Sequence, residues 1–381
     1  MKVLIIPSWY PEGEDKLMGI YHKEYTEALA KNGVDVDMLF VKRERLRNPL
    51  KYLFMKKCEI IQENGYKLYK IRMLDFESVC LKFHMWLYTK KLFKIYKTYL
   101  KENKKPDILH AQVTIPAGYA VKKLGEKIDV PVIITEHSSH FTKYFEGKYK
   151  DYGLYAIKNT KFTTVSNLMK KQVENEIKEI DILPNLVDTE IFKKEKYKRD
   201  NNKVNLITVS AFRIGKGIED IIKALNILVN DKKQSNIHLS IVGDGYNRDF
   251  YEKTAQELNL TKYITFHGVK SKSEIAELLS KNDIFIVGSH YESFCIPGIE
   301  ALASGTPIVS TKCHGPEEYL DKKCGEFCEV KNPEDMAEKI LIAIKNIDKY
   351  DMEHMRNIAD KYSAKEISKK AIAIYKKMIN E

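Results

Sequence analysis

The stretch of the chain that is most informative about its fold is VNLITVSAFRIGKGIEDIIKALNILVN, residues 204–230. Residues 204–209 form a short β-branched run that predicts a strand, and residues 218–230 have the apolar spacing of a helix. Further predicted strands lie at 237–242, 264–266, 284–287 and 308–310, and further predicted helices at 248–258, 273–281 and 297–303. Strands that alternate with helices in this way predict a doubly wound parallel sheet.

The first half of the chain repeats this pattern. Predicted strands lie at 2–6, 34–41, 107–110, 130–135 and 162–165, and predicted helices at 18–31 and 115–124. At 381 residues the chain exceeds the roughly 250–300 residues at which one hydrophobic core stops growing. We therefore expect an α/β protein of two Rossmann-like, doubly wound domains, residues 1–192 and 204–363, joined by the charged stretch 193–203.

The positive charge of the chain is concentrated in one segment. Residues 41–105 hold 18 Lys and Arg against 6 Asp and Glu, whereas the net charge of the whole chain is +11. No run of residues approaches the ~20 apolar residues of a membrane-spanning helix, and the six cysteines lack the density of a disulfide framework. We expect a cytoplasmic protein.

Within the basic segment, residues 81–105 have helical spacing of apolar and basic residues. One face, which lysines flank, can be shared by Phe83, Leu87, Phe93 and either Tyr96 or Leu100. This pattern is typical of a helix that lies on an anionic membrane surface. A core-facing helix with a solvated basic side would have the same pattern. The segment has none of the nucleic-acid-binding motifs, so we expect no nucleic-acid partner.

Ligands of open parallel sheets bind at the carboxyl ends of the strands, so the loops there supply the candidate residues. Gly19 opens a helix whose backbone amides suit an anion, although a plain turn glycine would look the same. Arg213 and Lys216 follow the strand 204–209, and together they could clamp a diphosphate. The alternative for this pair is a solvated loop.

The next two strands end in loops of the same kind. Gly243 and Gly245 would let the backbone approach a ligand closely, as would a tight turn without a ligand. His267 lies where main-chain groups could meet a nucleotide base, or it could be a structural histidine.

The strongest motif is the stretch from Glu292 to Glu300, ESFCIPGIE. Proline near its centre fits a first helical turn, so Glu292 precedes a short helix and Glu300 lies about one turn into it. Carboxylates accept hydrogen bonds from paired hydroxyls, so Glu300 suits a ribose and Glu292 a sugar. The amides of Phe294, Cys295 and Ile296 could meet phosphate at the helix start.

The spacing from Glu292 to Glu300 resembles the E-x7-E motif of retaining glycosyltransferases, and residues 292–307 resemble glycosyltransferase family 4. The opening residues 6–11 together with Gly19 are similar to its bacterial surface-polysaccharide members. The resemblance implies a GT-B fold, in which two Rossmann-like domains face each other across a cleft. It also implies that the N-terminal domain binds the acceptor, the C-terminal domain binds the donor, and the last helix, residues 364–381, packs back on the N-terminal domain.

The same resemblance implies roles for individual residues. Arg213 and Lys216 would neutralise the leaving diphosphate, Glu300 would hold the ribose, and Glu292 would touch the transferred sugar. His137, which follows a predicted strand, matches an active-site histidine of the family; a buried structural histidine is the alternative. The family needs no metal, and we expect no metal and no cofactor.

We therefore expect a retaining hexosyltransferase that moves a sugar from a nucleotide-sugar to a lipid-linked or anionic polysaccharide acceptor in surface glycan biosynthesis. A UDP-sugar is favoured over a GDP-sugar. The protein would be cytoplasmic or bound peripherally at the inner face of the cell membrane. The alternatives are a GT-B sugar-nucleotide epimerase and a noncatalytic basic surface-binding protein on a GT-B scaffold.

Overall fold

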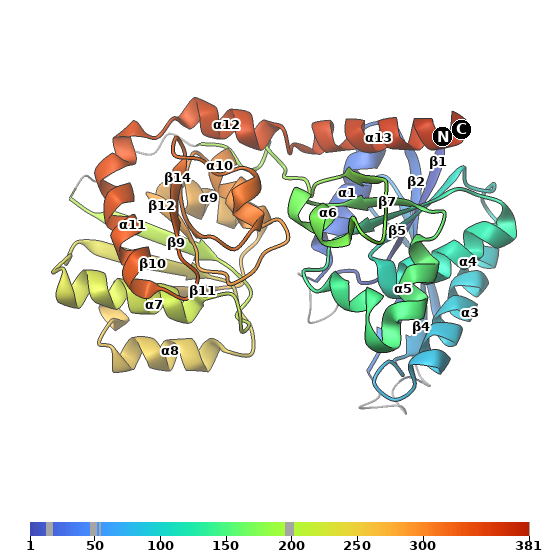
Figure 1. Ribbon diagram of the computed structural model, residues 1–381, viewed down its shortest axis with the longest axis horizontal. Helices are drawn as coiled ribbons and strands as arrows, with labels where there is room; N and C mark the ends of the chain where they lie inside the picture. The colour runs from blue at the N-terminus through green and yellow to red at the C-terminus, as the bar shows by residue number, and fades with distance from the viewer. Residues whose placement is uncertain (13–17, 46–51, 53–54, 195–201, 381) are drawn as a thin grey trace. The chain divides into compact units, whose positions relative to one another are not determined.

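The computed structural model describes residues 1–12, 18–45, 52, 55–194 and 202–380. The chain divides into two compact units (Figure 1). The first comprises residues 1–186 and 365–381, and the second comprises residues 187–364. Each has its own sheet and its own hydrophobic core.

The first unit is built on an eight-stranded sheet in the order β3-β4-β2-β1-β5-β6-β7-β8. The strands are β1 (Lys2–Pro7), β2 (Asp35–Glu44), β3 (Cys58–Gln62), β4 (Lys67–Leu74), β5 (Ile108–Gln112), β6 (Val132–Glu136), β7 (Lys161–Thr164) and β8 (Ile180–Ile182). All neighbours are parallel except β3, which pairs with β4 in an antiparallel hairpin. Residues 3–6 are fully buried, as a central strand covered on both faces requires.

Helices cover both faces of this sheet (Figure 1). They are α1 (Ile20–Lys31), α3 (Leu81–Tyr99), α4 (Tyr119–Ile128), α5 (Lys150–Ile157), α6 (Asn167–Val173) and the terminal α13 (Ala364–Asn380). Because side chains alternate along a strand, Leu109 of β5 and His110 point to opposite faces. Gly125 of α4 lies close to Leu109, and Tyr375 of α13 contacts His110. The last helix therefore belongs to the core of the first unit.

The second unit has a six-stranded, all-parallel sheet in the order β11-β10-β9-β12-β13-β14. The strands are β9 (Val204–Val209), β10 (Ile237–Val242), β11 (Ile264–Gly268), β12 (Ile284–Val287), β13 (Ile308–Thr311) and β14 (Gly325–Cys328). The helices are α7 (Ile218–Asn226), α8 (Arg248–Glu257), α9 (Lys272–Lys281), α10 (Ile296–Ala303), α11 (Pro333–Asn346) and α12 (Met352–Asp360).

The α/β fold class with two parallel-sheet domains is confirmed. Three local features differ from the sequence prediction. Residues 187–192 lie in the second unit instead of the first, because Val187 donates a backbone hydrogen bond to Tyr362 and pairs with Ser363. The β3–β4 hairpin was not predicted. The helix predicted from residue 115 is not helical there, because the backbone of Ile115 is extended with φ −128° and ψ 131°, and α4 begins at Tyr119. Most of the predicted linker lies outside the described residues.

Candidate functional site

The loops that carry the predicted donor residues meet at the centre of the second sheet. On one side of β9 the next strands in the sheet are β10 and β11, and on its other side they are β12, β13 and β14. The strand order therefore reverses between the neighbours β9 and β12, which form the topological switch point. Open α/β sheets bind ligands outside the carboxyl ends of the strands at such a point. Gly217 and Gly288 let the loops after β9 and β12 approach, since a Cβ at Gly217 would lie 1.8 Å from the Gly288 carbonyl oxygen.

Lys216 and Glu292 come together at this switch point, although 76 residues separate them. Lys216 Nζ lies 2.6 Å from Glu292 Oε1, which also accepts a hydrogen bond from Ser289 Oγ at 2.7 Å. Burial lowers the pKa of Lys216, but the Glu292 carboxylate outweighs this effect and leaves the pKa raised. The cation predicted for a diphosphate is therefore charged at neutral pH and held by the glutamate predicted for the sugar.

Glu300 lies one turn into α10, as predicted, and its side chain is 7% exposed. Lys272 Nζ, at the start of α9, lies 3.6 Å from Glu300 Oε1. The sequence prediction missed Lys272, because a lysine at the start of an amphipathic helix carries no signal of a partner 28 residues away. The carboxylate is thus held by a cation and partly shielded from water.

The residues between the two glutamates serve mainly the core. Phe294 is buried, and its ring packs against Tyr319 and Tyr362. Cys295 caps α10 in the left-handed region with φ 67°, and burial raises the pKa of its thiol well above the usual value. Ile296 is the first residue of α10. The contact of the backbone amides at this helix start with phosphate stays a prediction, whereas the buried thiol is unsuited to act as a thiolate nucleophile.

Three more predicted donor residues lie in the loops after β9 and β10. Arg213 is exposed, three residues before Lys216. A Cβ at Gly243 would lie 1.9 Å from the Ser210 carbonyl oxygen, and one at Gly245 would lie 2.6 Å from that of Phe212. Close packing of two loops therefore explains both glycines without a ligand, and donor contact by them stays a prediction.

His267 lies on β11, the edge strand of the second sheet. Its Nε2 is 3.1 Å from Ser240 Oγ on β10, and burial, with help from Lys270, lowers its pKa. The side chain thus has a structural partner within the sheet, as the alternative interpretation expected, and its predicted contact with a base stays a prediction.

In the first unit, Gly19 caps the N-terminus of α1 with φ 76°. A Cβ there would lie 2.7 Å from both Trp9 Cδ1 and the Trp9 carbonyl oxygen, so only glycine fits without a shift. The adjacent residues 13–17 lie outside the described part of the chain. The predicted contact of the α1 amides with an anion is untested.

His137 follows β6, as predicted, and both of its ring nitrogens are engaged. Nε2 lies 2.6 Å from Gln112 Oε1 and Nδ1 lies 2.9 Å from Asn185 Oδ1. Burial lowers the pKa of His137 to about 3, so the ring is neutral at pH 7. Its edge packs on His22, with ring centroids 5.0 Å apart. A neutral imidazole cannot donate to both amide oxygens, so one of these contacts fixes its tautomer.

A buried carboxylate organises the loop that carries His137. Glu136 Oε2 accepts hydrogen bonds from the Thr114 amide and hydroxyl at 2.8 and 2.6 Å, and Oε1 accepts from the His137 and Ser138 amides at 2.9 and 2.7 Å. Burial raises the pKa of Glu136, although these donors oppose the effect. The sequence prediction missed this residue because its donors include residues 22 positions earlier.

Helix α3 occupies the basic segment, and most of its predicted apolar face is not the face that packs on the sheet. The helix packs against β2 and β4 through a different set of residues, namely His84, Met85, Tyr88, Leu92, Ile95, Tyr96 and Tyr99. Phe83 instead remains 43% exposed, and its ring stacks on Trp86, which is 53% exposed. Tyr88, Tyr96 and Tyr99 contribute much of the apolar surface of the buried face, and Phe83 does not lie on that face.

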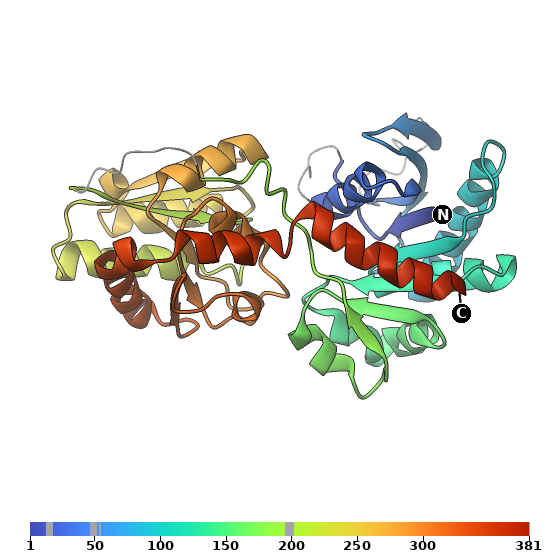
Figure 2. The same cartoon turned by 90° about the horizontal axis from the view of Figure 1, so that it is seen from above.

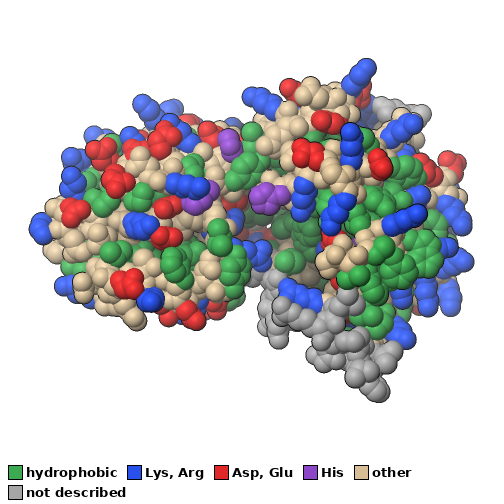
Figure 3. Space-filling view, turned by 60° about the horizontal axis from the view of Figure 1, so that its bottom comes forward, with side chains coloured by type: hydrophobic (Ala, Val, Ile, Leu, Met, Phe, Trp, Pro, Cys, Tyr) green, Lys and Arg blue, Asp and Glu red, His purple; other side chains and the backbone are tan. Residues whose placement is uncertain are grey.

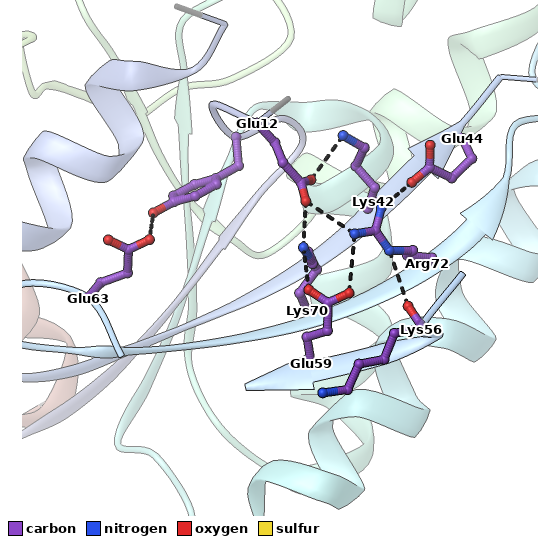
Figure 4. Close-up of polar contacts among 9 residues, drawn as sticks. Glu12, Lys42, Glu44, Lys56, Glu59, Glu63, Lys70 and Arg72 are labelled. Carbon is purple, nitrogen blue, oxygen red and sulfur yellow. Dashed lines mark hydrogen bonds and ion pairs between the residues drawn. The ribbon is translucent and has the colours of Figure 1, made fainter. Parts of the chain in front are cut away.

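Part of the positive charge of the basic segment is neutralised inside the unit (Figure 4). Lys70 Nζ, on β4, lies 2.5 Å from Glu12 Oε1 and 2.7 Å from Glu59 Oε2. Arg72, two residues further along the same strand, contacts Glu12, Glu59 and Glu44. Because Glu12 lies outside residues 41–105, the charge count of that segment overstates the charge of the folded surface.

Two groups of side chains among the described residues have donor atoms close enough to hold a metal ion: Asp321, Cys324 and His354, and Asp75, Glu77 and His84. Neither group includes a predicted site residue. Among the described helices, none combines the length and the apolar character that a membrane span needs.

Two family models match consecutive parts of the chain. The model described as Glycosyltransferase Family 4 matches residues 18–191, and that described as Glycosyl transferases group 1 matches residues 189–364. The chain belongs to the family 4 glycosyltransferases. Its two parallel-sheet domains are those of the GT-B fold. The two family models together therefore match both units of the chain.

Individual relatives and solved structures agree with this assignment. An uncharacterized glycosyltransferase of Methanocaldococcus jannaschii is 29% identical over 291 residues, which cover 75% of this chain and 78% of the relative. The sucrose-phosphate synthase of Thermosynechococcus elongatus superposes with a TM-score of 0.79 at 17% identity, over 100% of both chains. The Anabaena protein HepE in complex with UDP has a TM-score of 0.75 at 14% identity, over 99% of this chain and 100% of its own.

Proposed function

We propose that this glycosyltransferase takes its sugar from a nucleoside diphosphate sugar, with a UDP-sugar favoured, and transfers it with retention of the anomeric configuration. The observation that carries the proposal is the charged Lys216–Glu292 pair at the switch point of the second sheet. The complex of HepE with UDP supports a UDP-type donor. The acceptor we propose is a lipid-linked or polysaccharide glycan of the cell surface.

The chemistry follows from the charge that develops during transfer. As the bond between the anomeric carbon and the phosphate breaks, negative charge grows on the diphosphate, and fixed cations and helix N-termini stabilise it. Lys216 and Arg213 supply the cations, and the amides at the start of α10 supply the dipole. Without ligand, Glu292 neutralises Lys216; with the diphosphate bound, Lys216 is shared with the phosphate.

Glu300 is proposed to accept hydrogen bonds from the ribose hydroxyls, and Glu292 from the transferred sugar. His137 is proposed to contact that sugar. Retention would come from attack on the same face, with the leaving phosphate taking the proton of the acceptor hydroxyl. Each proton is thereby accounted for without a carboxylate nucleophile.

A thermal-shift experiment without added metal tests the donor. Ligand binding stabilises the folded state by RT ln(1 + [L]/Kd), about 2.7 kcal/mol at a hundredfold excess over Kd. We expect UDP to raise the melting temperature, and Glu300→Ala to remove most of the shift. Glu277→Ala, at an exposed glutamate of the same unit, is the control and should keep it. No shift with UDP, GDP or ADP would contradict the donor proposal, and epimerised sugar released without an acceptor would contradict the transferase proposal.

We also propose that α3 brings the first unit to an anionic membrane, where a lipid-linked acceptor would be found. Phe83 and Trp86 are exposed, and Lys90 Nζ lies 5.9 Å from the centre of the Trp86 ring. Hydrophobic side chains gather on one face of this unit beside lysine and arginine side chains (Figure 3). Aromatic rings and lysines on one face suit the interface of an anionic bilayer.

Replacing Lys90, Lys91, Lys94 and Lys97 of α3 with Ser is expected to weaken binding to vesicles that contain phosphatidylglycerol by about a thousandfold, since each lysine near such a surface contributes about 1 kcal/mol. Co-sedimentation measures this. The control replaces four lysines of α13, Lys365, Lys369, Lys370 and Lys376, with Ser, which changes the net charge equally. Equal binding by the two variants would refute the proposal.

A further inference from the structure

A buried chain of hydrogen bonds connects the last helix of the protein with His137. Tyr375 OH lies 2.8 Å from Tyr25 OH and 2.6 Å from His110 Nδ1. On the other side of the ring, Gln112 Nε2 lies 3.2 Å from His110 Nε2, and Gln112 Oε1 lies 2.6 Å from His137 Nε2. Every residue of this chain of hydrogen bonds belongs to the first unit.

The fold brings these residues together in a simple way. His110 and Gln112 are two residues apart on β5, so both side chains lie on the same face of the sheet. Helix α13 lies over the sheet of the first unit (Figure 2), and it places Tyr375 against His110. Tyr375 and His110 are fully buried and Gln112 is 1% exposed, so water does not compete for these hydrogen bonds.

The chain of hydrogen bonds restricts which ring nitrogen carries the proton in His110 and in His137. Burial lowers the pKa of His110 and of His137 to about 3, so at pH 7 each ring carries one proton on nitrogen. Gln112 Nε2 donates to His110 Nε2, which therefore lacks a proton. His110 Nδ1 must then carry the proton and donate it to Tyr375 OH.

The side-chain amide of Gln112 has the opposite role toward His137, because its oxygen and not its nitrogen faces that ring. Gln112 Oε1 and Asn185 Oδ1 can both only accept, so they compete for the single proton of His137. The shorter contact, 2.6 Å to Gln112 against 2.9 Å to Asn185, favours the proton on Nε2 and leaves Nδ1 without one. On the His110 side, Thr135 Oγ1 lies 2.7 Å from Nε2 and can donate to it when Thr163 Oγ1, 2.7 Å away, donates to Thr135. Gln112 therefore couples the tautomers of the two histidines, and a change at one ring is transmitted to the other.

We infer that Tyr375, on the terminal helix, is a positioning residue that sets which ring nitrogen of His137 carries the proton, acting through His110 and Gln112. His137 then presents Nδ1 as a hydrogen-bond acceptor to a substrate hydroxyl, in exchange for Asn185. This consequence for catalysis rests on the proposed contact of His137 with the transferred sugar. The position of the proton on His137 does not depend on that proposed contact.

Spectra of the full-length protein with ring-15N histidine test the inference, because protonated and unprotonated ring nitrogens have well separated 15N shifts. The His137 signals are assigned with a His137→Gln variant. We expect the wild type to carry the proton on Nε2, and Tyr375→Phe and Gln112→Met to shift the population toward Nδ1. Tyr99→Phe is the control, because it also removes a fully buried tyrosine hydroxyl, one without a hydrogen-bond partner among the described residues.

Kinetics provide the second measurement. We expect Tyr375→Phe to lower kcat by about tenfold while the KM for the donor changes little, as for an imidazole held in the wrong tautomer. Tyr99→Phe should leave kcat unchanged, and melting temperatures identify any variant that does not fold. A wild-type His137 protonated on Nδ1, or an unchanged tautomer in both Tyr375→Phe and Gln112→Met, would overturn the inference. A changed tautomer with full activity would support the coupling and refute the proposed role of His137.

Discussion

Lys216→Met is expected to lower kcat/KM by about a hundredfold to a thousandfold, the effect of removing one preorganised group that stabilises charge in a transition state. Lys216 Nζ is held 2.6 Å from Glu292 Oε1 at the switch point, where the diphosphate is proposed to bind. Methionine keeps the length of the side chain and removes only the cation. Steady-state kinetics with the donor identified by thermal shift would measure the loss.

Two further variants separate this effect from instability. Lys223→Met is the matched control, since Lys223 lies on α7 of the same unit and pairs with Glu219 across an exposed surface. Its activity should be unchanged. In Lys216→Met the Glu292 carboxylate, 13% exposed, loses its cation, and the double variant with Glu292→Gln removes that unpaired charge. Recovery of activity in the double variant, or a loss of less than threefold in Lys216→Met, would contradict the proposed role of Lys216.

The first unit is expected to unfold in acid because three histidines are buried in their neutral form. Burial lowers the pKa of His110 and His137 to about 3 and lowers that of His22 well below its usual value. Repulsion from neighbouring histidines adds to the effect at His110 and His22. An unfolded histidine binds a proton near pH 6.5, so between about pH 6.5 and 3 the unfolded state binds more protons. Stability is then lost as the pH falls, by about 1.4 kcal/mol per pH unit for each histidine and about 4 for all three.

Tryptophan fluorescence reports this transition selectively, since both tryptophans, Trp9 and Trp86, lie in the first unit. The free energy of unfolding, from guanidinium titrations at several pH values, should fall steeply below pH 6. His22 is the informative position, because within the described chain neither of its ring nitrogens has a hydrogen-bond partner.

His22→Phe should reduce the slope by about a third, because one of the three histidines that take up a proton on unfolding is gone. It should also stabilise the unit at pH 7 by removing an unpaired polar group from the core. His140→Gln, at an exposed residue of the same unit, should leave the slope unchanged. If the free energy of unfolding falls as steeply with pH in His22→Phe as in the wild type, a group other than His22 causes the acid sensitivity.

The candidate site was predictable to different degrees. Strand and helix periodicity predicted the loops that carry Arg213, Lys216 and Glu292, because each loop follows a strand and the carboxyl ends of parallel strands share one edge. It also predicted the short helix that carries Glu300. The periodicity did not identify their partners. Lys272 beside Glu300 depends on how α9 packs near α10, and the four donors to Glu136 come from two different loops.

Helix α3 shows where periodicity is ambiguous. Phe83, Leu87 and Phe93 form a plausible apolar stripe, but the helix is apolar over more than one face, and the fit of Tyr88, Tyr96 and Tyr99 against the sheet selected another. Several faces of one helix can satisfy the hydrophobic pattern, whereas only one is complementary in shape to its neighbours.

The sequence by itself determined the α/β class, the two parallel-sheet domains and the family, because these depend on local periodicity and on short motifs whose residues are neighbours in the chain. Only the tertiary structure decided which charges are paired, which face of α3 is buried and how Tyr375 reaches His137 through residues 265 and 25 positions apart along the chain. These contacts join segments that are distant in sequence. Their distances and protonation depend on packing and burial, which no local pattern encodes.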